Sequence, residues 1–146
     1  MPTTPDTHSD ALVFFGATGD LAFKKIFPAL QAMARRGDLQ VPVIGVAKAG
    51  WTIDQLRARA KDSVETYGGL DQAGFDKLIG LLRYVDGDYG DAATFAALRQ
   101  ALAGAERPAH DLAIPPPLFG LVVQQLAQSG CATGARVVVE KPFGHD

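Results

Sequence analysis

Small residues at regular intervals follow an apolar stretch near the start of the chain. Residues 11–15 are apolar and predict a buried strand, and Gly16, Gly19 and Ala22 come directly after it. A helical pattern begins there, so the turn lies at the positive end of a helix dipole, where backbone N–H groups attract anions. The spacing predicts a phosphate-binding turn. It is Gly-x-x-Gly-x-x-Ala rather than the full Gly-x-Gly-x-x-Gly, and small residues also pack ordinary strand-to-helix turns.

Apolar runs alternate with helical patterns along the rest of the chain. The predicted strands are residues 11–15, 41–47, 84–89, 112–114 and 136–140. The predicted helices are residues 22–36, 52–66, 71–82, 91–103 and a last one that begins at residue 118. Pro28 is expected to kink the first helix, and Thr52 with Gln55 forms a capping-box pattern at the start of the second.

The alternation of strands with helices predicts the fold class. Strands that are apolar on both faces indicate a parallel sheet covered on both sides. We therefore expect an α/β protein with a doubly wound, Rossmann-type parallel sheet in three layers, α/β/α, and the strand order 3-2-1-4-5. Ligands bind such sheets at the carboxyl ends of the strands, where the order reverses. The segments expected to converge there are residues 16–20, Lys48, Asp88 with Tyr89, Pro115 with Pro116, and residues 140–142.

Composition narrows the class of protein. The 146 residues are 47% apolar and 21% charged, which is typical of one globular domain. The net charge of −2 gives no basis for nucleic acid or an anionic membrane as partner, and no apolar run is long enough to span a membrane. The lone cysteine, Cys131, excludes an internal disulfide and favours a cytoplasmic setting, and we interpret it as a core or loop residue. Residues 1–9 are polar, do not form a secretory signal, and predict a disordered tail.

Four segments, in this order, resemble one enzyme family. They are residues 16–28, Ile44-Gly-Val-Ala-Lys48, Leu112-Ala-Ile-Pro-Pro116 and Val139-Glu-Lys-Pro-Phe-Gly144. Together they resemble the N-terminal coenzyme-binding domain of glucose-6-phosphate dehydrogenase, and the last is similar to the substrate-site signature of that family. The resemblance implies that residues 10–146 form an NADP-binding domain. It also implies that the family's C-terminal domain, with its sugar-phosphate ligands and dimer interface, is absent from this chain.

The resemblance also implies roles for individual residues. The cofactor-binding residues that it implies are Gly16, Ala17, Thr18, Gly19, Asp20, Leu21 and Ala22 around the pyrophosphate, Lys48, Asp88 and Tyr89 on the adenosine side, and Lys141 near the nicotinamide. Lys48 favours NADP, because a cation at the end of strand two accommodates a 2′-phosphate. No carboxylate follows Lys48 until Asp54. The structural alternatives are a solvated Lys48, a first-turn carboxylate at Asp20 and a half-buried core ring at Tyr89.

Other positions are implied to bind substrate or depart from the family pattern. Lys141 and Lys25 are the implied substrate-binding residues, and the bond before Pro142 is cis in the family. Phe23 replaces a base that is common in the family, which lowers the positive charge at the helix start. Asp111 stands where the family often has a tyrosine near the cofactor.

The implied reaction is oxidation of the C1 hydroxyl of glucose 6-phosphate to 6-phosphogluconolactone, a step of the pentose phosphate pathway. Hydride passes to the nicotinamide, and a histidine acts as general base. His8, His110 and His145 do not match that base, and we interpret all three as surface histidines. We therefore expect no catalytic residue and no metal site in this chain, and no turnover by the chain alone.

Two other functions compete with this interpretation. A stand-alone NADP-binding module or regulator without catalysis requires the same nucleotide crevice. A different Rossmann enzyme, such as an epimerase or reductase, requires a Tyr-x-x-x-Lys pair that the sequence lacks. The full-length family is homo-oligomeric, and the sequence does not determine the oligomeric state of this chain.

Overall fold

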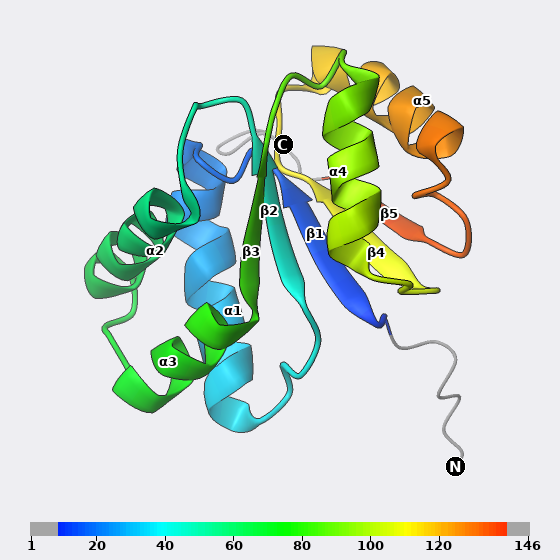
Figure 1. Cartoon of the computed structure of the whole chain (residues 1–146). Helices are drawn as coiled ribbons and strands as arrows, with labels where there is room; N and C mark the ends of the chain where they lie inside the picture. The colour runs from blue at the N-terminus through cyan, green and yellow to red at the C-terminus, as the bar shows by residue number, and fades with distance from the viewer. Residues whose placement is uncertain (1–8, 140–146) are drawn as a thin grey trace.

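The computed structural model of the chain describes residues 9–139 as a parallel sheet between two layers of helices (Figure 1). Five strands lie in the order β3-β2-β1-β4-β5, which confirms the predicted order. The strands are β1 (Ala11–Phe15), β2 (Val43–Ala47), β3 (Leu82–Asp86), β4 (Pro108–Leu112) and β5 (Arg136–Val139). The helices are α1 (Phe27–Arg36), α2 (Ile53–Thr66), α3 (Gln72–Leu81), α4 (Ala92–Leu102) and α5 (Phe119–Ser129). A π-helical turn (Ala22–Ile26) leads into α1, and a 3-10 turn (Pro116–Leu118) leads into α5.

Some predictions concern residues outside the described range. These are the tail predicted at residues 1–9, apart from Ser9, and the positions His8, Glu140, Lys141, Pro142 and His145.

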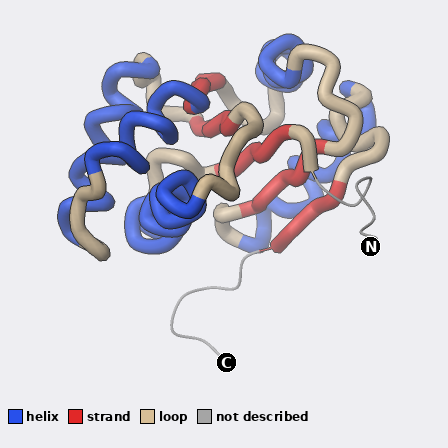
Figure 2. Tube along the Cα trace, turned by 90° about the horizontal axis from the view of Figure 1, so that it is seen from below, coloured by secondary structure: helices blue, strands red, loops and turns tan. Residues whose placement is uncertain are grey.

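The two faces of the sheet carry different helices. Helices α1, α2 and α3 cover one face and α4 and α5 the other, and Figure 2 shows helices on either side of the strands. Adjacent side chains of β1 point to opposite faces. Phe14 meets Phe27 of α1 edge-to-face, with ring centroids 5.4 Å apart, and Phe15 stacks on Phe95 of α4 at 5.9 Å. Since each face has its own apolar core, the predicted three-layer architecture is confirmed.

Local sequence signals set the helix ends. The capping box of α2 forms as predicted: Gln55 N–H donates to Thr52 Oγ1 at 3.3 Å, and Thr52 N–H donates to Gln55 Oε1 at 2.8 Å. Gly37 ends α1 in the left-handed conformation, with φ of 81°. At Pro28 we find a change of helix type, because the π-helical turn ends directly before α1. Pro28 is the second residue of α1 and lies inside a helical segment that is continuous from Asp20, so its missing N–H interrupts the hydrogen-bond ladder where the helix type changes.

Strand β4 differs from the prediction. It spans Pro108–Leu112, whereas the apolar pattern predicts a strand at residues 112–114. The strand contains a proline, a histidine and an aspartate, so only its last residue, Leu112, belongs to the apolar run. It forms because β1 pairs with it along its whole length, from Ala11 opposite Pro108 to Phe15 opposite Leu112.

Strands β3 and β2 are also shifted from their predicted positions. β3 spans Leu82–Asp86 rather than residues 84–89, and β2 begins at Val43 rather than at residue 41. The pairing of these two strands runs from Val43 opposite Leu82 to Ala47 opposite Asp86, which fixes both ends. Asp86 is therefore the last residue of β3, and residues 88–89 lie in the following turn.

The expectation that His110 is a surface histidine is wrong. It lies in β4 with 0% of its surface exposed, and its Nε2 is 2.9 Å from the carbonyl oxygen of Cys131. A carbonyl only accepts, so Nε2 carries the proton of the neutral ring. Burial lowers the pKa of His110 below its ordinary value of 6.5. Cys131 is buried as well, in the core that α4 and α5 cover, in agreement with its interpretation as a core or loop residue.

We expect His110 to make the stability of the fold depend on pH. The unfolded chain binds a proton at this histidine near pH 6.5, whereas the folded chain resists protonation. The free energy of unfolding therefore falls as the pH drops through 6.5. Urea unfolding at pH 7.5 and 5.5 should show this loss in the wild-type chain and a smaller loss in His110→Phe. Equal losses in the two chains would contradict the assignment. Asp10, Asp86 and Asp88 have pKa values below 3.8, so they do not titrate in this window.

Candidate functional site

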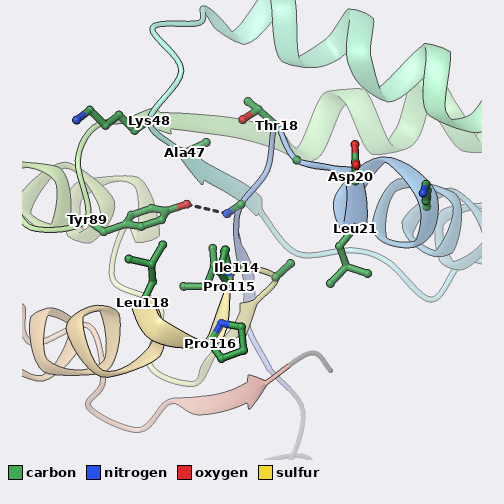
Figure 3. A pocket seen from close by; sticks show the side chains of 14 residues that line it. Thr18, Asp20, Leu21, Ala47, Lys48, Tyr89, Ile114, Pro115, Pro116 and Leu118 are labelled. Carbon is green, nitrogen blue, oxygen red and sulfur yellow. Dashed lines mark hydrogen bonds between the residues drawn. The ribbon is translucent and has the colours of Figure 1, made fainter. Parts of the chain in front are cut away.

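A cleft of about 580 Å³ opens at the carboxyl ends of β1, β2 and β4 (Figure 3). This is the point where the strand order reverses, since β2 and β4 flank β1 on opposite sides. The lining residues are Gly16, Thr18, Gly19, Asp20, Leu21, Lys24, Ala47, Lys48, Tyr89, Ala113, Ile114, Pro115, Pro116 and Leu118. The structure thus brings together most of the predicted cofactor residues. Ala17, Ala22 and Asp88 lie outside this lining.

Gly16 is required by the fold itself. Its φ is +83°, and a Cβ built on it would lie 2.1 Å from the carbonyl oxygen of Ala113 in the segment after β4. Its N–H donates to Val46 O at 2.9 Å and to the Tyr89 hydroxyl at 2.8 Å. The N–H of Ala17 also donates to Val46 O, at 3.2 Å. These N–H groups join β1 to β2 and are not directed at the cleft.

Gly19 has a different environment. A Cβ at this position would meet only the carbonyl oxygen of Gly16, at 3.4 Å, which is an ordinary contact. Glycine is therefore not required here by packing within the chain. Directly after it, Asp20 and Leu21 start the helical segment, and the first N–H groups of a helix have no partner within it. Because Gly19 carries no side chain, an anion can approach those groups closely.

Ala17 and Ala22 act behind the turn. Both are fully buried. A Cβ on Gly45 of β2 would lie 2.9 Å from the Cβ of Ala17, so the turn packs directly on the sheet. The small side chain of Ala17 thus lets the turn lie close to the sheet.

Tyr89 is a half-buried ring packed on the core, as its structural alternative predicts, and it also lines the cleft. Its hydroxyl accepts the N–H of Gly16 and lies 3.3 Å from the carbonyl oxygen of Val46, to which it donates. Its ring packs edge-on against Phe15, with centroids 5.8 Å apart, and also lines the cleft (Figure 3). Burial raises the pKa of Tyr89, so the hydroxyl keeps the proton that it donates. Tyr89 therefore joins the turn after β3 to Gly16 and Val46 through its hydroxyl, and its ring lines the cleft.

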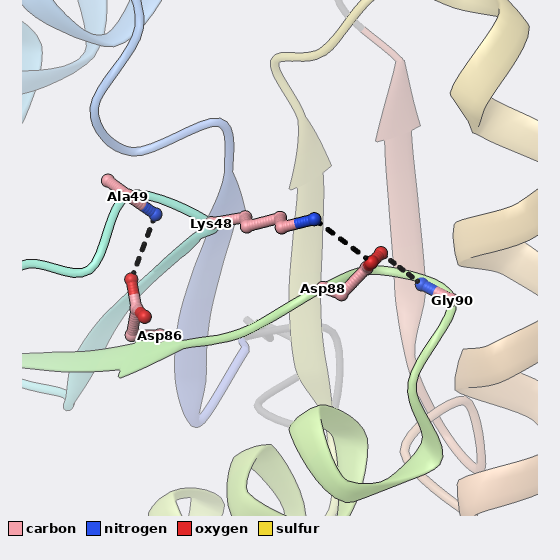
Figure 4. Close-up of polar contacts among 5 residues, drawn as sticks. All are labelled: Lys48, Ala49, Asp86, Asp88 and Gly90. Carbon is pink, nitrogen blue, oxygen red and sulfur yellow. Dashed lines mark hydrogen bonds and ion pairs between the residues drawn. The ribbon is translucent and has the colours of Figure 1, made fainter.

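Lys48 forms an ion pair at the end of β2 (Figure 4). Its Nζ lies 3.2 Å from Oδ2 of Asp88, and the two side chains are 71% and 56% exposed. Oδ1 of Asp88 accepts the N–H of Gly90 at 2.9 Å. The Gly90 N–H and the Lys48 ammonium both lower the pKa of Asp88, so its carboxylate is charged. Lys48, which is predicted to bind the 2′-phosphate, is therefore already paired with a carboxylate of this chain.

Asp86 was missed by the sequence pattern. Its Oδ1 accepts the N–H groups of Ala49 and Gly50, at 3.0 and 2.9 Å, and the hydroxyl of Tyr84 also donates to it. The Tyr84 hydroxyl is the main cause that lowers the pKa of Asp86. This carboxylate fixes the backbone directly after Lys48. The signal that could have found Asp86 is the end of β3. When β3 ends at residue 86, Asp86 is the last residue of the strand and lies opposite Ala47 at the end of β2.

Arg59 was also missed, and it changes the expectation about Phe23. The guanidinium carbon of Arg59 in α2 lies 4.4 Å from the centroid of the Phe23 ring. Its Nη2 donates to the carbonyl oxygen of Gly19 at 3.4 Å. A cation from another helix thus stands beside the turn, where Phe23 replaces a base. No spacing along the sequence connects residue 59 with residue 19.

Lys25 lies away from the cleft. It lines a second cavity of about 420 Å³ on the α1 side of the sheet, together with Asp111 and Val138, whereas Lys24 lines the main cleft. Lys141 lies outside the described residues. The substrate-binding roles of Lys25 and Lys141 stay predictions.

Two kinds of feature are absent from residues 9–139. Within that range, no three histidine, cysteine, aspartate or glutamate side chains gather in a way that would hold a metal ion. No helix there is long and apolar enough to cross a membrane.

Comparison with known proteins gives the family. The family model described as "Glucose-6-phosphate dehydrogenase, NAD binding domain" matches residues 13–146. This chain belongs to the glucose-6-phosphate dehydrogenase family. It corresponds to the domain of that family that binds a nicotinamide dinucleotide. The predicted fold and the predicted resemblance are both confirmed.

Individual relatives agree with this assignment. Glucose-6-phosphate 1-dehydrogenase 1 of Mycobacterium tuberculosis is 43% identical over 138 residues, which are 94% of this chain and 30% of the relative. The crystal structure of glucose-6-phosphate 1-dehydrogenase from Mycobacterium avium superposes with a TM-score of 0.87 and 44% identity, over 95% of this chain and 31% of the other. A glucose-6-phosphate dehydrogenase in complex with glucose-6-phosphate gives 0.80 and 30% identity, over 94% and 31%. The chain spans about 30% of the length of these relatives.

We expect Gly16→Ala and Gly19→Ala to have different effects. Gly16→Ala should destabilise the chain by about 2–4 kcal/mol, because a side chain there combines a strained φ with a backbone clash. Gly19→Ala should change stability by less than about 1 kcal/mol and yet weaken dinucleotide binding, because its methyl group stands on the anion's approach. Chemical unfolding and fluorescence titration of both variants measure this. Unchanged binding in Gly19→Ala would contradict a phosphate site at this turn.

Proposed function

We propose that this chain binds NADP in the cleft, as the coenzyme-binding part of a glucose-6-phosphate dehydrogenase. The turn at Gly19 is the observation that carries the proposal. Its open glycine adjoins a helix start in a cleft at the point where the strand order reverses. Packing within the chain does not account for glycine at that position, whereas close approach of a pyrophosphate does.

The residues around the turn fit the parts of such a cofactor. The first-turn N–H groups near Thr18, Asp20 and Leu21 suit a pyrophosphate. Lys48 suits a 2′-phosphate, and the Tyr89 ring offers an apolar surface for the adenine. One wall of the cleft is apolar and consists of Ile114, Pro115, Pro116 and Leu118. When bound, the cofactor supplies a nicotinamide ring that accepts hydride, and this chain binds and orients it.

We assign the substrate chemistry to the whole enzyme. Glucose 6-phosphate would be oxidised at C1 to 6-phosphogluconolactone, with Lys141 and Lys25 as substrate-binding residues of this chain. A relative's structure contains glucose-6-phosphate, which supports a sugar phosphate as the ligand. We place the general base outside the described residues, because the cleft lining within residues 9–139 includes no histidine. A cytoplasmic location and homo-oligomeric assembly belong to the same proposal.

A binding module without catalysis is the second candidate. The observation in its favour is the position of His110, the histidine that the described range 9–139 contains, which lies buried against Cys131 and away from the cleft. Both candidates require dinucleotide binding. They differ in whether a general base for hydride transfer is present beside the bound dinucleotide.

The choice of cofactor can be tested at Lys48. We expect NADP to bind the wild-type chain more tightly than NAD. Lys48→Ala should weaken NADP binding by about fivefold, the scale of one exposed charge pair, and leave NAD almost unaffected. Titration of both cofactors by calorimetry measures this. The matched control is Lys61→Ala, an exposed lysine of α2 outside the cleft lining. Equal wild-type affinities for NADP and NAD would count against the NADP assignment.

Catalysis can be tested with the purified 146-residue chain. We expect no NADPH formation with saturating glucose 6-phosphate and NADP, because hydride transfer needs a positioned base and no histidine lines the cleft within residues 9–139. Absorbance at the wavelength of NADPH measures this, with mass spectrometry to exclude longer chains. Turnover at the rate of an ordinary dehydrogenase, abolished by Lys141→Ala, would overturn the expectation.

A further inference from the structure

The Lys48–Asp88 ion pair joins residues far apart in the sequence at the mouth of the cleft (Figure 4). Other exposed pairs, such as Arg36–Asp38 and Arg57–Asp54, join residues that are neighbours in the chain. Exposed pairs of this kind contribute little to stability. The position of the Lys48 pair therefore matters more than its energy, since its cation lines the cleft and its anion stands beside it.

Both partners are held in place by backbone hydrogen bonds. On the lysine side, Asp86 accepts the N–H groups of Ala49 and Gly50, the two residues after Lys48. On the carboxylate side, Gly90 N–H donates to Asp88 Oδ1, and Asp91 N–H donates to the carbonyl oxygen of Asp88 at 3.1 Å. The Asp88 side chain is thereby oriented with its second oxygen, Oδ2, toward the lysine. The pair is organised before any ligand arrives.

A 2′-phosphate that approaches Lys48 meets this arrangement. The ammonium already has a carboxylate at 3.2 Å, so a 2′-phosphate has to displace that carboxylate before it can pair with the lysine. NAD carries hydroxyl groups on this ribose and does not compete with the carboxylate for the charge of the lysine. We propose that Asp88 sets the cofactor preference of this cleft, because its carboxylate competes with the 2′-phosphate of NADP for Lys48 and narrows the discrimination against NAD. This inference rests on the proposed dinucleotide function of the cleft.

The test compares Asp88→Asn with a matched control. The asparagine keeps an oxygen that accepts the Gly90 N–H and removes only the charge that faces Lys48. Asp38→Asn removes a carboxylate that is 60% exposed, against 56% for Asp88, from an ion pair outside the cleft lining. Calorimetric titration uses NADP, NAD and adenosine 2′,5′-bisphosphate, and thermal unfolding checks that each variant is folded.

Asp88→Asn should raise the affinity for NADP and for the bisphosphate by about fivefold and change the affinity for NAD by less than about twofold. Asp38→Asn should change none of them. In the Lys48→Ala background the gain from Asp88→Asn should vanish, because no ammonium is left to release.

Other outcomes would overturn the inference. A gain that persists in the Lys48→Ala background would show general charge repulsion instead of competition for the lysine. A loss of NAD affinity in Asp88→Asn would identify Asp88 as a ribose ligand. NADP binding that is unchanged in Asp88→Asn would refute the inference and leave the proposed function standing. Failure of the wild-type chain to bind either cofactor would refute both.

Discussion

The backbone contact between Gly16 and the segment after β4 is the constraint on which the site depends. A Cβ at Gly16 would lie 2.1 Å from the carbonyl oxygen of Ala113, so only glycine lets the ends of β1 and β4 come this close. From that contact β1 turns directly into the helix start, while residues 114–118 pass along the other side. The cleft opens between these two departing segments and is also lined by Ala47, Lys48 and Tyr89.

The glycines of the turn serve different physical purposes. Gly16 is needed by the protein in the absence of any ligand, whereas Gly19 has room for a methyl group within the chain. Ala17 and Ala22 are small because the sheet lies directly behind them. The motif therefore combines positions where the fold requires a small residue with one, Gly19, where packing within the chain does not.

Charges around the cleft come from several elements. Lys48 lies at the end of β2, Asp88 in the turn after β3, and Arg59 in α2. The acidic residues Asp86 and Asp88 differ in purpose: Asp86 binds backbone N–H groups and fixes a loop, while Asp88 faces the lysine. The electrostatic character of the site thus depends on loops whose conformations are set by hydrogen bonds rather than on the glycine turn alone.

The sequence by itself determined the layered fold, the strand order and the position of the cleft, because β1 and β2 are buried on both faces and their apolar runs carry that signal. It also located the turn at residues 16–22 and the cation at Lys48. Only the tertiary structure decided the extent of β4, since Pro108, His110 and Asp111 form a strand through pairing with β1 and not through their own propensity. It alone decided the partners of Lys48 and Gly19, because Asp88 and Arg59 lie 40 residues away along the chain and reach them only when the sheet and α2 are in place.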